Sequence, residues 1–244
     1  MTLSTRFEGK VMFATGGGSG IAAATARRFA AEGGRVAVVD LDAGRAAEVA
    51  SELDGSVGIG CDVADEASVQ AAVREARERL GRIDCVLNAA GFVHFAPVEE
   101  LAVEDWNRML AVHLTGTFLV CKTALPHLRA AGGGSIVNLA SVTALVARVN
   151  LAAYSAAKGG IIAFSRQFAI EAGVDNVRVN VLAPGSVRTP MTRPVYLEGA
   201  LPQSIQARLA EPEEIAASAC FLLSDEASFF TGALLVADGG ATAV

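Results

Sequence analysis

The stretch KVMFATGGGSGIAAATARRFA, residues 10–30, indicates how the fold begins. Residues 10–14 form a mostly apolar run, which is typical of a strand buried on both faces. Residues 21–30 are rich in Ala and predict a helix. The glycine-rich turn between them would let backbone approach a pyrophosphate, and the start of the helix would supply N–H donors and a positive dipole. Because glycine also ends strands for steric reasons alone, the rest of the chain has to decide between these interpretations.

Apolar runs alternate with helical patterns along the whole chain. Six further strand candidates follow the first, at 35–40, 57–62, 83–91, 134–141, 177–185 and 233–240. One of the helical patterns between them starts at a potential N-cap, Asp65, and places apolar residues at helical spacing up to Leu80. Strand–helix alternation predicts βαβ units, a parallel sheet and right-handed crossovers. We therefore expect a single α/β domain over residues 1–244.

One segment, residues 186–211, breaks the alternation. It contains Pro190, Pro194 and Pro202 and shows no strand pattern. Long irregular insertions in compact domains are often lids or binding loops, so we expect a substrate lid at about 190–209. A plain crossover with a short helix is the alternative.

Composition excludes several classes of function. The net charge of −6 argues against a nucleic-acid partner. The four cysteines lie far apart without CxxC spacing, so we expect reduced, buried thiols and neither disulfides nor a metal site. No uninterrupted apolar run reaches about 18 residues, and the first residues lack the apolar core of a signal peptide. We expect a cytoplasmic protein without a membrane partner.

The second strand candidate ends in Asp40, about 20 residues after the glycine turn. A carboxylate at this place can accept hydrogen bonds from an adenosine ribose and would repel a 2′-phosphate. Leu41 and Asp42 follow it, with no arginine directly after the carboxylate. The sequence thus favours NAD(H) over NADP(H). Asp40 could instead cap the next helix, although Asp42 could take that role.

The motifs together resemble the short-chain dehydrogenase/reductase family, in its branch of about 250 residues. This branch includes NAD-dependent secondary-alcohol dehydrogenases and 3-oxoacyl-ACP reductases. The matching motifs are TGGGSGIA (15–22), CDV (61–63), NAAG (88–91), Ser141, YSAAK (154–158), APGSVRTPM (183–191) and SDEASFFTGALLVADGG (224–240). The resemblance implies a doubly wound (Rossmann) fold with a seven-stranded parallel sheet and helices on both faces. It also implies a nicotinamide cofactor along the carboxyl edge of the strands.

The resemblance assigns roles to individual residues. Ser141, Tyr154 and Lys158 match the catalytic residues. Those that would contact the cofactor are Gly16, Ser19, Gly20, Ile21, Asp40, Leu41, Asp62, Val63, Asn88, Ala90, Gly91, Tyr154, Lys158, Pro184, Gly185, Val187 and Thr189.

Two positions depart from the family pattern. Ala22 stands where a third glycine is usual. His113 stands where the family has a catalytic asparagine, so it is a fourth catalytic candidate. A neutral imidazole has one donor and one acceptor, which would let His113 either replace the asparagine in a proton relay or simply bridge two backbone groups.

Tyr154 and Lys158 are four residues apart, so a helix would place them on one face. Tyrosine has a pKa near 10, too high for a base at neutral pH. An ammonium ~5 Å away contributes about 3 kcal/mol at an effective dielectric constant of ~20, or roughly 2 pKa units. With the charge of an oxidised nicotinamide added, Tyr154 could act as general acid and base while Ser141 polarises the substrate oxygen.

A mainly apolar substrate pocket is expected, with Val93, Val142, Leu151 and Met191 among its walls. Arg148, Arg188 and Arg193 are the nearby cations that could bind a carboxylate, unless they are solvated surface residues. We therefore expect hydride transfer between NAD(H) and a secondary alcohol or ketone. An NADPH-dependent 3-oxoacyl-thioester reductase and, more remotely, a catalytically impaired cofactor sensor are the alternatives. The family resemblance also implies a homotetramer or homodimer.

Overall fold

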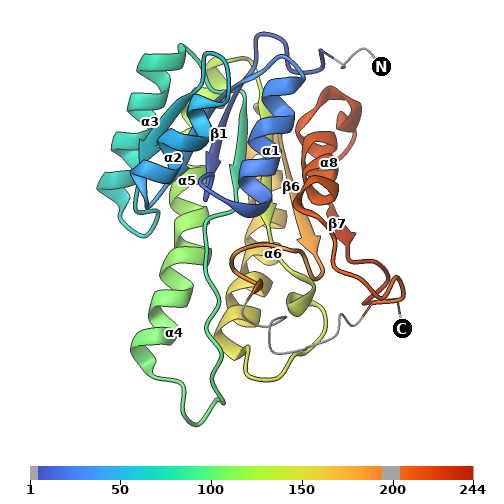
Figure 1. Ribbon diagram of the computed structural model, residues 1–244. Coiled ribbons are helices and arrows are strands. Elements are labelled where there is room, and N and C mark those ends of the chain that lie inside the picture. Colours follow the sequence, from blue (N-terminus) through green and yellow to red (C-terminus); the bar gives the residue numbers. More distant parts are fainter. Residues whose placement is uncertain (1–4, 194–203, 244) are drawn as a thin grey trace.

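The sheet has seven strands, all parallel, in the order β3-β2-β1-β4-β5-β6-β7 (Figure 1). This computed structural model describes residues 5–193 and 204–243. The strands are β1 (Val11–Thr15), β2 (Arg35–Asp40), β3 (Val57–Gly60), β4 (Cys85–Asn88), β5 (Gly134–Leu139), β6 (Val177–Pro184) and β7 (Leu234–Ala237). The doubly wound α/β fold expected from the sequence is confirmed. Several of the apolar runs predicted as strands are longer than the observed strands, because the last residues of these runs belong to the loops that form the site.

Helices cover both faces of the sheet. Those flanking one face are α1 (Gly20–Ala31), α2 (Ala43–Ser51) and α8 (Pro212–Leu223), and those flanking the other are α3 (Glu66–Leu80), α5 (Gly116–Ala130) and α6 (Ala152–Gly173). A shorter helix, α4 (Val103–Leu110), continues through a π-helical turn, Ala111–Thr115, directly into α5. Figure 1 shows α4 and the first part of α6 extending beyond the carboxyl ends of the strands.

Two hydrophobic cores, one on each face, explain why the strand sequences are continuously apolar. In β1, Val11 and Phe13 belong to the core under α3, α5 and α6, whereas Met12 and Ala14 belong to the core under α1 and α8. Successive side chains of a strand point to opposite faces, so a central parallel strand needs apolar residues at every position.

All four cysteines are buried as free thiols. Burial raises the pKa of Cys85, Cys121 and Cys220 to about 12, so these thiols stay protonated at neutral pH. Among the described residues, no group of three or more His, Cys, Asp or Glu side chains is placed to hold a metal ion.

The continuous helical rod Val103–Ala130 is long and apolar enough to cross a membrane by length and composition alone. Here it packs within the fold, with α5 lying against α3, β4 and β5. Within its most apolar window, 44 % of the residues are buried in this chain. The apolar residues left exposed on the rod include Phe118.

Candidate active site

The catalytic candidates meet at the carboxyl edge of the sheet, just beyond β5. Ser141 follows that strand in extended conformation and caps the short 3-10 turn Val142–Ala144, where its Oγ accepts the Thr143 N–H at 3.2 Å. Tyr154 lies in the first turn of α6, and Lys158 follows one turn later. A strand end and a helix start thus bring Ser141 and the Tyr–Lys pair together, as the sequence pattern predicts.

Lys158 is fixed from two sides. Its Nζ donates to the backbone oxygen of Leu139 at 2.7 Å and lies 5.6 Å from the centre of the Tyr154 ring. Only 5 % of the residue is exposed, and this burial lowers the pKa of Lys158 to about 7. The amino group of Lys158 is therefore only partly protonated at neutral pH.

The hydroxyl of Tyr154 is held in its neutral form. Burial raises the pKa of Tyr154 to about 12, while its contact with the Ser141 side chain lowers the pKa by a smaller amount. In the chain without cofactor, this direction is opposite to the one that the sequence analysis expected with a positively charged nicotinamide bound. The reason is that burial penalises the tyrosinate strongly and also removes part of the Lys158 charge that would stabilise it.

His113 bridges the cofactor side of the site to Tyr154. Its Nε2 lies 2.8 Å from the Phe92 backbone oxygen and 3.2 Å from the Phe92 nitrogen. Its ring meets the Tyr154 ring edge-on, with the centres 5.3 Å apart. Burial, helped by the charge of Lys158, lowers the pKa of His113 to about 3. The imidazole is therefore neutral at any physiological pH, and its Nδ1 is buried without a hydrogen-bond partner.

A π-helical turn carries His113, and its neighbour Gly91 makes room for the ring. The turn spans Ala111–Thr115, and the hydroxyl of Thr117 donates to the His113 carbonyl at 2.7 Å. A Cβ on Gly91 would lie 2.1 Å from the His113 ring. The sequence analysis found neither feature. The pairing of a small residue at 91 with a ring at 113 is visible only in three dimensions.

A groove with a volume of about 390 Å³ contains nearly all of the expected cofactor contacts. Of those 17 positions, Asn88 is the exception. It is buried beneath the groove and donates to Asn138 Oδ1 at 2.8 Å, so it supports the floor and does not line it. The expected contacts that line the groove are Gly16, Ser19, Gly20, Ile21, Asp40, Leu41, Asp62, Val63, Ala90, Gly91, Tyr154, Lys158, Pro184, Gly185, Val187 and Thr189. Arg45, His113 and Ser141 are among the further residues that line it.

The glycine turn has the form of a cradle. Gly16 has φ +68°, and a Cβ there would lie 2.9 Å from the Ala90 nitrogen. Gly20 also has positive φ, +56°, at the start of α1. Ser19, the N-cap residue, makes no side-chain hydrogen bond to the helix, which leaves the first N–H groups for a ligand. The departure at Ala22 is absorbed in the core between α1 and the sheet.

Asp40 stands at the other end of the groove. Its carboxylate accepts the Gly18 N–H at 3.0 Å and the Asp42 N–H at 3.1 Å. Asp42, not Asp40, caps α2, because its side chain accepts the Gly44 and Arg45 N–H groups. The groove therefore fits a dinucleotide, with backbone donors at its middle and a fixed carboxylate where an adenosine ribose would lie.

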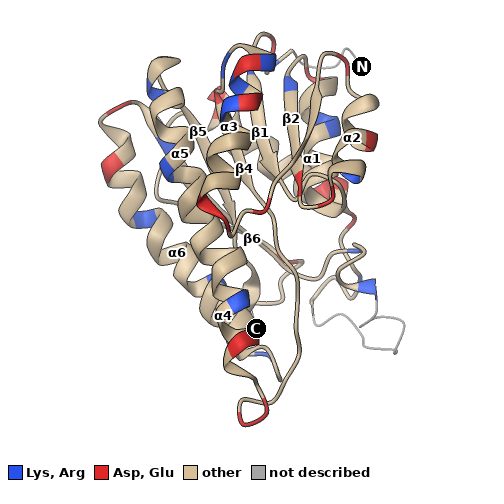
Figure 2. Ribbon diagram, turned by 90° about the vertical axis from the view of Figure 1, so that its left-hand side faces the viewer, with Lys and Arg blue, Asp and Glu red and all other residues tan. Residues whose placement is uncertain are grey.

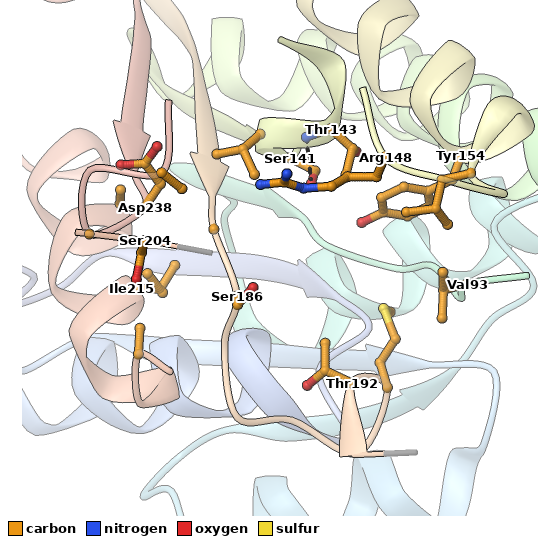
Figure 3. A pocket seen from close by; sticks show the side chains of 18 of the residues that line it. Val93, Ser141, Thr143, Arg148, Tyr154, Ser186, Thr192, Ser204, Ile215 and Asp238 are labelled. Atoms are coloured by element: carbon orange, nitrogen blue, oxygen red, sulfur yellow. Dashed lines mark hydrogen bonds between the residues drawn. The ribbon is translucent and has the colours of Figure 1, made fainter. Parts of the chain in front are cut away.

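A second cavity, of about 700 Å³, meets the groove at Ser141 and Tyr154 (Figure 3). The four predicted substrate residues Val93, Val142, Leu151 and Met191 line it. Thr192, Ser204, Gln206 and Arg208 line it too; they belong to the expected lid, on either side of residues 194–203, which lie outside the described part of the chain.

The sequence analysis missed one wall of this cavity. Glu214 and Ile215 from α8, Ala237 at the end of β7, and residues 238, 239 and 241 beyond it form this wall. These residues come from chain segments far from the catalytic motifs, and nothing in their local pattern indicates a pocket.

Comparisons with known proteins are consistent with this geometry. A family model described as enoyl-(acyl carrier protein) reductase matches residues 16–242. D-threitol dehydrogenase of Mycolicibacterium smegmatis is 44 % identical over 97 % of this chain and 94 % of its own length. Meso-2,3-butanediol dehydrogenase of Serratia marcescens is 42 % identical over 98 % and 96 %. The crystal structure of a 3-ketoacyl-(acyl-carrier-protein) reductase from Brucella melitensis complexed with NADH matches with a TM-score of 0.90 and 34 % identity, covering 96 % of this chain and 99 % of that one.

Proposed function

Because the chain belongs to the short-chain dehydrogenase/reductase family, whose relatives act on CH–OH groups, we propose that it interconverts a secondary alcohol and its ketone with NAD(H). The observation that carries this proposal is the junction of the two cavities. Ser141 and Tyr154 border both the dinucleotide-shaped groove and the substrate cavity. An alcohol carbon placed beside them would therefore lie against the end of the groove.

The cofactor, when bound, accepts or supplies the hydride at its nicotinamide ring. Gly16, Gly20 and the start of α1 would hold its pyrophosphate, and Thr189 lines the groove beside Gly20, where a Cβ on the glycine would lie 3.3 Å from the Thr189 methyl group. Asp40 supports NAD(H) over NADP(H), because a carboxylate fixed by two backbone N–H groups would face the 2′-position and repel a phosphate there.

The proton follows a separate route through the chain's own residues. Tyr154 takes the hydroxyl proton of the alcohol during oxidation and returns it during reduction. Ser141 donates a hydrogen bond to the substrate oxygen. Because the pKa of Tyr154 in the chain alone is about 12, an added positive charge is needed before the tyrosinate forms near neutral pH.

His113 holds this arrangement in place. It fixes the Phe92 peptide through Nε2 and packs against the Tyr154 ring. Its strongly lowered pKa argues against an imidazolium in a proton relay. Its unpaired Nδ1 leaves room for one further hydrogen bond in which the ring stays neutral.

A polar substrate is supported by the cavity wall, which contains the hydroxyl groups of Ser141, Thr143, Ser186, Thr192 and Ser204. The names of two relatives, threitol and butanediol dehydrogenases, refer to substrates with more than one hydroxyl group. Reduction of a 3-oxoacyl thioester with NADPH is the second candidate, and the likeness to a 3-ketoacyl reductase favours it. A sensor without catalysis is disfavoured because Ser141, Tyr154 and Lys158 lie together.

We also propose a homotetramer or homodimer in the cytoplasm. Helix α6 carries few charges along its length in Figure 2. Its Phe164 meets Phe118 of α5 edge-on, with the ring centres 6.1 Å apart. Phe118, Ile170 and Val174 remain exposed, which supports pairing of the α5 and α6 surfaces between subunits.

Absorbance at 340 nm tests the proposal, with NAD⁺ and NADP⁺ each offered against a panel of secondary alcohols and hydroxy acids. We expect turnover with NAD⁺. Tyr154→Phe should lower kcat by about 10²- to 10⁴-fold, the usual contribution of a general acid–base. NADH fluorescence should show that the variant still binds the cofactor. Undiminished turnover in Tyr154→Phe would refute the role of Tyr154, and a clear NADP⁺ preference would favour the thioester-reductase alternative.

A further inference from the structure

We propose that Arg108 of α4 is a further cofactor-binding residue, and that its guanidinium holds the pyrophosphate of the dinucleotide from the side opposite the glycine turn. This inference rests on the cofactor site of the proposed function and adds a charged partner to it. The contacts expected from the sequence do not include Arg108, although the residue lines the groove. The charges around the groove explain why a cation is needed there.

Both acidic and basic side chains line the described wall of the groove. The carboxylates are those of Asp40 and Asp62, and the cations are Arg45, Arg108 and Lys158. The pyrophosphate of a dinucleotide is itself anionic, so the carboxylates oppose its binding. Backbone N–H groups at the glycine turn are dipoles without a net charge. A cation beside the pyrophosphate would therefore contribute a favourable interaction that the turn alone does not supply.

The charges of Arg45 and Lys158 are already offset or reduced. Arg45 Nε lies 3.4 Å from the Asp42 carboxylate. Lys158 donates to the Leu139 oxygen, and burial lowers the pKa of Lys158 to about 7, so its charge is only partial at neutral pH. Within the described part of the chain, by contrast, no ion pair includes Arg108. Because arginine stays protonated in proteins, Arg108 brings a full positive charge to the groove.

An aromatic ring fixes the place of the Arg108 guanidinium. The central carbon of the guanidinium lies 5.2 Å from the centre of the Phe92 ring. The Phe92 peptide is in turn held by His113, whose Nε2 lies 2.8 Å from the Phe92 oxygen. A guanidinium has five N–H donors, and a phosphate group occupies only two of them, so the contact with the ring leaves donors for a ligand. Such preorganisation lowers the entropy cost of binding, although the Arg108 side chain is exposed.

The topology of the sheet explains how a residue of α4 reaches the cofactor groove. The strand order reverses between β1 and β4, and doubly wound folds bind their ligands at such a switch point. Helix α1 starts there on one face of the sheet, whereas α5, the continuation of α4, packs on the other face. Arg108 and Val112 are one helical turn apart, and both line the groove. The crevice therefore has the start of α1 on one side and Arg108 on the other.

A close contact links the glycine turn to the segment beneath Arg108. A Cβ on Gly16 would lie 2.9 Å from the Ala90 nitrogen, two residues before Phe92. The turn that would hold the pyrophosphate thus adjoins the segment whose ring carries the Arg108 guanidinium. A pyrophosphate at the turn has backbone donors on one side and guanidinium donors on the other.

Two ligands that differ in the pyrophosphate test the role of Arg108 without turnover. ADP-ribose contains the adenosine and the pyrophosphate of NAD(H), whereas adenosine has no phosphate. Both would be used to displace NADH from the full-length protein while the NADH fluorescence is followed. We expect Arg108→Gln to raise Kd for ADP-ribose by about 10-fold, the lower end for a charged hydrogen bond, because the residue is exposed. Kd for adenosine should stay close to the wild-type value.

Matched variants separate the charge of Arg108 from the rest of its side chain. Arg108→Lys keeps the charge and should give an intermediate Kd for ADP-ribose. Arg129→Gln removes an arginine at the other end of the same helical rod, where it pairs with Asp175 at 2.6 Å, and should bind ADP-ribose as wild type does. Added NaCl should weaken ADP-ribose binding more steeply in wild type than in Arg108→Gln, because salt screens the contact between charges.

The binding results separate this inference from the proposed function. Equal Kd values for ADP-ribose in wild type and Arg108→Gln overturn the inference, while NADH binding and alcohol oxidation by wild type would leave the proposed function intact. A loss of affinity in Arg108→Gln that is equal for ADP-ribose and adenosine also overturns it, because that result assigns Arg108 a merely structural role. Failure of wild type to bind NADH and ADP-ribose overturns both.

Discussion

At the scale of the residue, burial sets the protonation states around the reacting atoms. Without ligand, the pKa of Lys158 is lowered to about 7, that of Tyr154 is raised to about 12 and that of His113 is lowered to about 3. The free enzyme at neutral pH therefore has a neutral tyrosine, a partly charged lysine and a neutral histidine. Binding of a positively charged nicotinamide would change the protonation of Tyr154 before that of Lys158 or His113.

Tyrosinate absorbance at 295 nm can follow that change, because the chain has only two tyrosines. In wild type minus Tyr154→Phe, the difference signal at pH 10 should stay small without cofactor, since the pKa of Tyr154 lies near 12. With saturating NAD⁺, the difference signal should rise at a lower pH than it does without cofactor. A difference titration that NAD⁺ does not move would show that the cofactor does not activate Tyr154.

Lys158 makes stability depend on pH in a defined direction. Between pH 7 and about 10.5 the unfolded chain keeps a proton on this lysine that the folded chain lacks, so folding stability should rise with pH. Below pH 7 both states are protonated and the contribution is constant. Urea unfolding of wild type and Lys158→Met from pH 6.5 to 9.5 should show a steeper rise in wild type. Parallel curves would contradict the lowered pKa.

At the scale of the element, the link between β4 and the helical rod depends on a close contact. A Cβ on Gly91 would meet the His113 ring at 2.1 Å, so Gly91→Ala should destabilise the protein by about 1–3 kcal/mol. The smaller side chain in His113→Asn should relieve part of this cost. Urea unfolding of wild type, both single variants and the double variant measures the coupling. Strictly additive effects would mean that residues 91 and 113 do not compete for the same space.

Some of the elements could be predicted from the sequence, and others could not. Strand positions followed from continuous apolar runs, and the Asp65 cap and Leu80 end of α3 followed from local chemistry. The π-helical turn could not be predicted, because it depends on where His113 finds its partners. The sequence analysis expected Lys158 and a bound nicotinamide together to lower the pKa of Tyr154; in the chain without cofactor burial raises it instead, and the depth of burial is a property of the packed chain that the sequence does not show.

At the scale of the whole molecule, an apolar surface remains along the α5–α6 side. Phe118→Glu should break an assembly built on this surface, because a carboxylate would have to be buried in the interface. Light scattering after gel filtration should show a lower mass for Phe118→Glu than for wild type. An unchanged mass for Phe118→Glu would place the subunit contact on another face.

The order of the chain also separates the two cavities in time during synthesis. The described residues of the cofactor groove all lie between positions 16 and 192, whereas one wall of the substrate cavity needs residues 237–241. When the nascent chain has left the ribosome up to the end of β6, the groove still lacks Gly185, Val187 and Thr189, and β7 has still to join the edge of the sheet. The residues of the groove are therefore synthesised before that wall of the substrate cavity, but α1, whose start forms the glycine cradle, packs against α8 and gains that support only once residues 212–223 have followed.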